Sequence, residues 1–186
     1  MNYIIVGLGN IGPEYADTRH NIGFMILDEL AKREGIKFYN ERLAYYTDFK
    51  YKSRTLYLIK PTTYVNLSGK AVGYWMKTLK IPVENVLVLV DEIALPFGTL
   101  RLKPKGSAGG HNGLKSVEAT LGHSDYARLR FGVGNDFPKG QQVNYVLDGF
   151  AKDELPALPA LIERSIEMIK SFVTTGAELT MTRYNK

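Results

Sequence analysis

Hydrophobic and polar positions follow two different spacings along this chain. Strand-like spacing occurs at residues 2–6, 45–60, 86–90, 98–103 and 128–134, and the second stretch is long enough for two strands around a turn near Ser53. Helical spacing occurs at 21–34, 68–79, 114–121 and 156–175. Because strands and helices alternate, we expect an α/β fold: a twisted mixed β-sheet with helices on both faces, in three αβα layers.

The sequence indicates a single domain over residues 1–186. It contains no repeat, low-complexity tract or Pro/Gly/Ser-rich linker, and its length suits one hydrophobic core. The run VLVLV at 86–90 is apolar throughout, which is typical of a central strand covered on both faces. In the predicted hairpin, Tyr57 and Ile59 should face one side of the sheet, and Leu56 and Leu58 the other.

The composition indicates the cellular compartment in which the protein works. The chain has no cysteine, which excludes disulfides, thiolate catalysis and cysteine–zinc sites and fits a reducing cytoplasm. No apolar run approaches the roughly 20 residues that cross a bilayer. The segment MNYIIVGLGN has no basic residue ahead of its short apolar run, so we interpret it as a buried strand and not as a signal peptide.

The charge balance points weakly towards an anionic partner. The formal net charge is +5 and the sequence pI is about 9.2. A basic enzyme often has an anionic substrate, and nucleic acid is the commonest large one, although an ordinary solvated surface gives the same balance.

The glycine-rich segment GLGNIG, at 7–12, matches the dinucleotide fingerprint G-x-G-x-x-G after a predicted strand. The fingerprint also requires a helix that starts on these glycines, whereas Pro13 follows here and the predicted helix starts near Asn21. The alternative is a tight turn whose glycines permit positive φ and which presents the side chain of Asn10.

Three histidines and one aspartate are candidates for proton chemistry. His123 lies in a polar loop. His111 lies at a helix start, where its role could be simply to make a local hydrogen bond. His20 lies between a loop and a helix, close in sequence to Asn10. Asp91 closes the strand VLVLV, at the strand end where α/β sheets bind ligands. It could cap a helix, or it could orient a histidine and stabilise its protonated form.

Other mechanisms lack their sequence signatures. There is no G-x-S-x-G elbow, SGKA at 68–71 lacks the glycine spacing of a P-loop, and the histidines lack the H-x-x-x-H spacing of many zinc sites. Water activation by a histidine–aspartate pair remains, and this chemistry suits an ester, whose leaving alkoxide is far better than an amine.

Five segments resemble the bacterial peptidyl-tRNA hydrolase family in order and spacing. They are GLGNIGPEYADTRHNIGF (7–24), PTTYVNLSGKAV (61–72), VDEIALPFG (90–98), KGSAGGHNGLKS (105–116) and RLRFGVG (128–134). The resemblance covers nearly the whole chain. It implies a cofactor-free, cytoplasmic monomer that hydrolyses the ester between an N-blocked aminoacyl or peptidyl group and the tRNA 3′ end. The activity recycles tRNA from peptidyl-tRNA released by stalled ribosomes.

The resemblance also implies residue roles. His20 is the catalytic base, Asp91 supports it, and Asn10 orients the substrate and separates blocked from unblocked aminoacyl-tRNA. The residues implied to hold the peptidyl–adenosine end are Tyr15, Tyr64, Asn66 and Asn112. The residues implied to grip tRNA phosphate are Lys103 or Lys105, with Arg130. Without the resemblance, Tyr64 could be a core aromatic and Asn66 a helix cap.

The sequence departs from the family's usual residues at Ile11, Tyr64–Val65, Ala94–Phe97 and Asn135–Asp136, and no catalytic candidate is lost. Three other functions stay open at this point. One is a dinucleotide-dependent enzyme using GLGNIG, another is a non-catalytic RNA-binding module using the basic segment 101–105, and the third is a relative with another role, as in chloroplast splicing factors.

Overall fold

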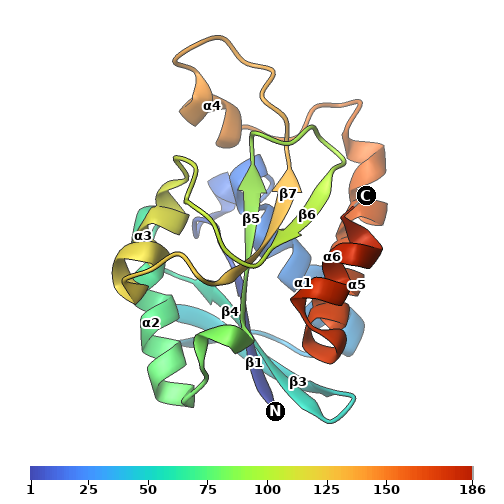
Figure 1. The fold of residues 1–186 in the computed structure, drawn as a ribbon. Coiled ribbons are helices and arrows are strands. Elements are labelled where there is room, and N and C mark those ends of the chain that lie inside the picture. The colour runs from blue at the N-terminus through green and yellow to red at the C-terminus, as the bar shows by residue number, and fades with distance from the viewer. Residues whose placement is uncertain (186) are drawn as a thin grey trace.

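In a computed structural model, which describes residues 1–185, the chain forms a seven-stranded sheet in the order β2-β3-β4-β1-β5-β7-β6 (Figure 1). The strands are β1 Asn2–Gly7, β2 Tyr39–Glu41, β3 Ala44–Tyr51, β4 Arg54–Pro61, β5 Val86–Glu92, β6 Leu100–Lys103 and β7 Ala127–Gly132. Strands β4, β1, β5 and β7 run parallel, whereas β2, β3 and β6 run antiparallel to their neighbours. The predicted mixed sheet is confirmed.

Helices cover both faces of the sheet, as predicted. They are α1 Ile22–Glu34, α2 Ser68–Leu79, α3 Asn112–Leu121, α4 Gln142–Val146, α5 Leu158–Thr175 and α6 Ala177–Tyr184. Helices α1, α5 and α6 pack on one face and α2 and α3 on the other, while α4 lies beyond the carboxyl ends of β5 and β7 (Figure 1). Among residues 1–185, no helix combines the length and apolar composition that crossing a membrane requires.

The burial pattern follows the alternation in the sequence. Leu56 and Leu58 pack in the layer of α1 and α5, whereas Ile59 packs in the layer of α2 and α3. Strand β5 lies between β1 and β7 and is buried from Val86 to Asp91. The central strand and the two faces of the hairpin were therefore predicted correctly.

Three elements were absent from the prediction: β2, α4 and α6. All three residues of β2 are exposed, so that strand has no apolar alternation. Helix α4 buries no residue fully, and α6 buries only Thr180. Periodicity detects elements with an apolar face, so these three leave little signal.

Helices α2 and α3 approach each other closely at a glycine. The backbone N–H of Gly69 donates to Ser116 Oγ at 2.9 Å, and a Cβ added at Gly69 would lie only 2.1 Å from the Ser116 carbonyl oxygen. This contact fixes the distance between the amino end of α2 and the middle of α3. Asn66 precedes α2 and Asn112 begins α3, so the contact also sets the spacing of two predicted substrate residues.

The end of the described chain returns to the sheet edge. Asn185 Oδ1 accepts from the backbone N–H of Leu102 at 2.8 Å, and Asn185 Nδ2 donates to the Leu102 carbonyl at 2.8 Å. Leu102 lies in β6, the last strand in the sheet order. The side chain of Asn185 therefore makes the two bonds that a neighbouring strand would make.

Candidate active site

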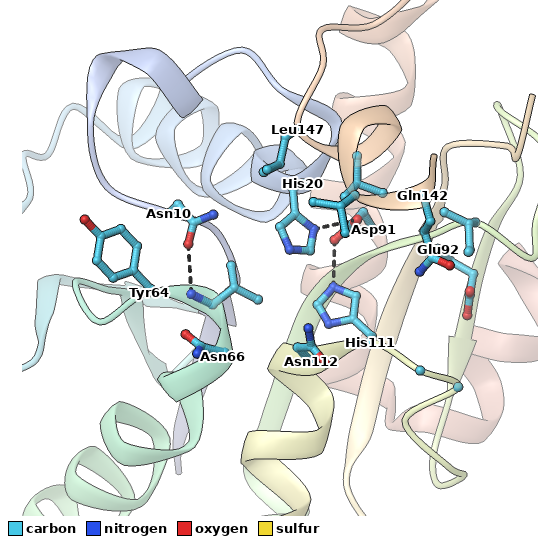
Figure 2. A pocket seen from close by; sticks show the side chains of 16 residues that line it. Asn10, His20, Tyr64, Asn66, Asp91, Glu92, His111, Asn112, Gln142 and Leu147 are labelled. Carbon is cyan, nitrogen blue, oxygen red and sulfur yellow. Dashed lines mark hydrogen bonds and ion pairs between the residues drawn. The ribbon is translucent and has the colours of Figure 1, made fainter. Parts of the chain in front are cut away.

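A cavity of about 270 Å³ opens where β1 and β5 end. Its walls come from the loop after β1, the 3₁₀ turn Arg19–Asn21, the 3₁₀ turn Val65–Leu67 with Tyr64, the end of β5, the start of α3, and α4 (Figure 2). Asn10, His20 and Asp91, the three residues predicted to be catalytic, all line this cavity.

The glycines after β1 make room for α1. A Cβ at Gly7 would lie 2.4 Å from the Gly23 carbonyl oxygen, and one at Gly9 would lie 2.9 Å from the Phe24 ring. Of the three glycines in GLGNIG, only Gly12 has a positive φ, at 117°. The expected turn with positive φ is therefore right for Gly12 and wrong for the other two. Helix α1 packs against Gly7 and Gly9, but it begins only at Ile22 and does not follow directly from the glycine-rich segment as the dinucleotide fingerprint requires.

Asn10 is held by both its backbone and its side chain. Its backbone N–H donates to Asn21 Oδ1 at 2.9 Å, and its carbonyl accepts from Asn21 Nδ2 at 2.8 Å. Asn10 Oδ1 accepts from the backbone N–H of Val65 at 2.8 Å, which fixes the orientation of the amide. The group that Asn10 offers to the cavity is therefore its NH₂, a pair of donors.

His20 and Asp91 form the predicted pair. His20 Nδ1 lies 2.8 Å from Asp91 Oδ2, and Asp91 is only 4% exposed (Figure 2). A carboxylate accepts only, so Nδ1 of His20 carries the proton in the neutral ring and Nε2 has the free lone pair. Of the two uses considered for Asp91, the histidine partner is the one found.

A second histidine on Asp91 was missed. His111 Nε2 lies 2.9 Å from Asp91 Oδ1, and His111 Nδ1 accepts from the backbone N–H groups of Gly113 and Leu114 at the start of α3. The expected local bond is present, but the contact with Asp91 is additional. Since Nδ1 accepts, Nε2 must carry the proton and donate to Asp91. The pattern H-N-G at a helix start was a signal for the cap, whereas nothing in the sequence indicated the distant carboxylate.

Burial and charge act in opposite directions on the His20–Asp91 pair. Burial lowers the pKa of His20, but the charge of Asp91 and its hydrogen bond outweigh burial, so the pKa is raised above the usual 6.5. Burial likewise works to raise the pKa of Asp91, but its contacts with His20 and His111 hold that pKa well below its usual range. The pair therefore favours a protonated His20 facing an ionised Asp91.

His20, Asp91 and His111 are close enough to suggest a metal site, with ligand atoms within 4.8 Å of one another. Binding a metal through His111 Nε2 would displace its proton to Nδ1, and Nδ1 faces two backbone N–H donors. Two donors cannot pair, so the helix cap opposes metal binding by this residue. The donor set fits a hydrogen-bonded chain better than a metal centre.

Three of the four predicted substrate residues line the cavity: Tyr64, Asn66 and Asn112. Tyr64 is 58% exposed, so it is not a core aromatic. The N-cap position of α2 is Leu67, which makes no side-chain hydrogen bond, and the nearby N–H of Gly69 donates to Ser116 Oγ, so Asn66 does not cap this helix. Tyr15, half-buried in the 3₁₀ turn Pro13–Tyr15, lies outside the cavity lining.

The predicted phosphate contacts lie outside the cavity. Lys103 and Lys105 are exposed at the end of β6 and in the loop that follows. Arg130, on β7, is half-buried and its guanidinium lies 3.7 Å from a carboxylate oxygen of Glu92. The two lysines are therefore accessible to a large anion, whereas Arg130 already faces an acid.

The wall contributed by α4 was also missed. Gln142, Val143, Val146 and Leu147 line the cavity, and Val143 is 66% exposed. The positions 143, 146 and 147 have helical spacing within an otherwise polar stretch. That short pattern could have revealed the wall, although it is too brief to be distinctive.

Comparison with known proteins gives one family. The family model described as peptidyl-tRNA hydrolase matches residues 4–186. Two relatives named peptidyl-tRNA hydrolase, from Cytophaga hutchinsonii and Phocaeicola vulgatus, are each 55% identical over 185 and 186 residues; the match spans 100% of this chain and 98% and 100% of theirs.

The fold agrees with solved structures of this family. The crystal structure of peptidyl-tRNA hydrolase from Acinetobacter baumannii matches with a TM-score of 0.92 and 32% identity, covering 98% of this chain and 94% of the other. A complex of a peptidyl-tRNA hydrolase with N-propanol gives the same TM-score, identity and coverage. The chain therefore belongs to the peptidyl-tRNA hydrolase family.

Proposed function

We propose that this protein hydrolyses the ester that joins an N-blocked aminoacyl or peptidyl group to the 3′ end of tRNA, and so recycles tRNA from peptidyl-tRNA released by stalled ribosomes. The observation that carries the proposal is the 2.8 Å bond from His20 to buried Asp91, inside a cavity lined by amide side chains. The bond leaves Nε2 of His20 as a free base beside donors suited to an ester and a peptide group.

The reaction begins at Nε2 of His20. This nitrogen removes a proton from a water molecule as the water oxygen attacks the ester carbonyl carbon. Asp91 stabilises the imidazolium that forms. The tetrahedral intermediate then collapses, the bond to the ribose oxygen breaks, and Nε2–H of His20 returns the proton to that oxygen. No proton is gained or lost by the enzyme over the cycle.

Asn10 supplies substrate selection in this proposal. Because its Oδ1 is occupied by the Val65 N–H, only its NH₂ faces the substrate. The NH₂ donates to the carbonyl oxygen of the peptide group next to the scissile ester. An unblocked aminoacyl-tRNA has no carbonyl there and carries an amine that is partly protonated near neutral pH. Sites built to pair a polar group reject analogues that lack it.

The remaining predicted residues bind the tRNA end. Tyr64, exposed on the cavity rim, stacks on the terminal adenine, while Asn66 and Asn112 bind the sugar and the peptide. Tyr15 contacts the peptidyl–adenosine end from outside the cavity, and Lys103 or Lys105, with Arg130, contacts tRNA phosphate. The protein works as a monomer without a cofactor, since all groups required by the reaction come from this one chain. It works in the cytoplasm, where ribosomes release peptidyl-tRNA.

The test is turnover of a blocked substrate. Purified protein should release N-acetyl-amino acid from N-acetyl-aminoacyl-tRNA in the presence of a metal chelator and without added dinucleotide. His20→Ala should lose at least about 10²-fold in kcat, the lower range for general-base catalysis, with tRNA affinity and Tm nearly unchanged. Binding without turnover would instead indicate an RNA-binding module, and half of the wild-type turnover in His20→Ala would refute the assigned base.

A further inference from the structure

Arg19 precedes His20 in the 3₁₀ turn and is 6% exposed. Its guanidinium lies 3.8 Å from the centre of the Tyr145 ring and donates to the Tyr145 carbonyl at 3.0 Å. A carboxylate oxygen of Glu154 lies 3.6 Å from the same guanidinium. An arginine buried in this way is held in one position, because a buried charge is stable only with its partners in place.

The backbone strengthens the same connection. The N–H of Arg19 donates to the Asp148 carbonyl at 3.0 Å, and Thr18 and Gly149 form an isolated antiparallel bridge. Residues 142–149, which include α4 and its continuation, are thus joined to the turn that carries His20. We call these residues the α4 wall.

Apart from these bonds, Tyr145 is the main anchor of the α4 wall: it packs against the core, and its ring centre lies 4.9 Å from that of Phe137. Residues 142–147 include no fully buried side chain, and Val143 and Leu147 are exposed at the cavity. On the far side, the Tyr145 hydroxyl donates to the Val133 carbonyl at 2.6 Å. Elements with few buried apolar contacts open at low free energy, so the polar contacts of Arg19 and Tyr145 decide the position of this wall.

We infer that Arg19 is a positioning residue, which acts through Tyr145 to hold the α4 wall over the cavity in a fixed relation to the His20 turn. This inference rests on the proposed function for its effect on turnover, but its structural part stands independently. Arg19 does not line the cavity, so it contributes to binding by placing Val143, Val146 and Leu147 against the substrate.

The chain offers a matched control. Arg164, on α5, lies 5.0 Å from the centre of the Tyr184 ring and donates to the Tyr184 carbonyl at 3.2 Å. It repeats the arginine–tyrosine contact at a place that does not line the cavity. Arg164→Gln therefore removes the same kind of interaction without touching the α4 wall.

The experiment compares Arg19→Gln, Tyr145→Leu, the double variant and Arg164→Gln in the full chain. Amide hydrogen exchange in residues 142–149 should accelerate by roughly thirtyfold in Arg19→Gln, the factor expected for loss of a desolvated cation–π contact. KM for N-acetyl-aminoacyl-tRNA should rise by a similar factor, with kcat little changed because the His20–Asp91 bond remains. Arg164→Gln should alter neither quantity.

The double variant separates positioning from general destabilisation. If Arg19 acts through Tyr145, combining the two substitutions should be no worse than the stronger single one, whereas additive effects would overturn the inference. Wild-type exchange in residues 142–149 of a folded Arg19→Gln variant would also overturn it. If Arg19→Gln fails to fold, Tyr145→Leu alone must show the faster exchange. Lack of turnover in wild type would refute the proposed function and leave the exchange result standing.

Discussion

At the scale of single residues, the site is a chain of three side chains with fixed proton positions. The start of α3 makes His111 Nδ1 an acceptor, so His111 Nε2–H donates to Asp91 Oδ1. The other carboxylate oxygen then accepts from His20 Nδ1. Asp91 thereby decides which nitrogen of His20 is free to take a proton, and the start of α3 holds that carboxylate through His111.

The charge on His20 should set the acid limb of the activity. The base must be neutral, and its pKa is raised above 6.5. As the pH is lowered, kcat/KM should therefore decrease, with a midpoint above 6.5. Stability should change in the opposite sense. The pair's contribution is complete below 6.5, where His20 is also protonated in the unfolded chain, and is lost as pH rises through the folded pKa. Kinetic profiles and NMR titration of His20 check this, and a kinetic midpoint below 6.5 would contradict it.

Replacing Asp91 by Asn should disable the base by changing its tautomer. The donor Nε2–H of His111 selects the amide oxygen of the new side chain, which turns the amide NH₂ towards His20 Nδ1. His20 must then accept at Nδ1 and carry its proton on Nε2, where it cannot take one from water. We expect kcat to fall by roughly 10²–10⁴-fold. The pKa of His20 should also fall; an unchanged NMR titration would show that the two groups do not interact.

Replacing Asn10 by Asp should weaken discrimination. The aspartate retains an acceptor for the Val65 N–H, but it removes the two donors and adds a negative charge at the cavity. Hydrolysis of N-acetyl-aminoacyl-tRNA should slow, and unblocked aminoacyl-tRNA should be relatively favoured. The measurement is kcat/KM for both substrates in both proteins. If the ratio of kcat/KM between the two substrates is unchanged, another part of the cavity must discriminate between them.

At the scale of elements, the cavity depends on how closely two helices approach. Gly69→Ala would place a methyl group against the Ser116 carbonyl, a backbone group that cannot rotate away. We expect a loss of about 1–3 kcal/mol in the free energy of unfolding. A lower kcat/KM should accompany it, because Asn66 and Asn112 move apart.

Gly73→Ala is the control for this prediction. Its added methyl would meet only the Thr120 side-chain methyl group at 2.7 Å, and Thr120 is exposed and free to change rotamer. Its stability should stay within about 1 kcal/mol of wild type, since alanine also favours the helix. Denaturant unfolding gives the free energy of unfolding of both variants. Equal decreases in the two would mean that the close contact at Gly69 does not account for the effect.

The apolar spacing within single helices and strands explains how far the sequence could predict the structure. The apolar periodicity of β5, α2 and the hairpin strands predicted their positions because each buries an apolar face. Alternation failed for Arg128, which shares a strand face with Arg130 yet is only 1% exposed, because three backbone carbonyls accept from its guanidinium. The positions of His20 and Asp91 in the chain made them candidates, and the resemblance gave them roles. The contact of Asp91 with His111 joins residues from separate elements, which no local pattern encodes.

At the scale of the whole molecule, the fold gathers its chemistry at one end of the sheet. The cavity draws on six separate segments of the chain, and the parallel strands β1 and β5 help to bring them together. The opposite end of the sheet carries none of the residues proposed to act on the ester; of the proposed site residues in strands, only Lys103, paired with Arg128 near the start of β7, lies towards that end. Substitutions there should change stability without changing substrate choice.

The bonds from Asn185 to Leu102 bear on behaviour at high concentration. An edge strand with free N–H and carbonyl groups can pair with the same strand of another molecule, which leads to aggregation. Asn185 blocks one such site on β6. Asn185→Ala should therefore increase light scattering with protein concentration, whereas Asn85→Ala, which removes a bond to the Asn2 carbonyl, should not. Equal scattering from both variants would show that the asparagine serves only to dock the carboxyl-terminal helix. If only Asn185→Ala scatters more light, this one amide side chain helps to keep the protein in solution as separate molecules.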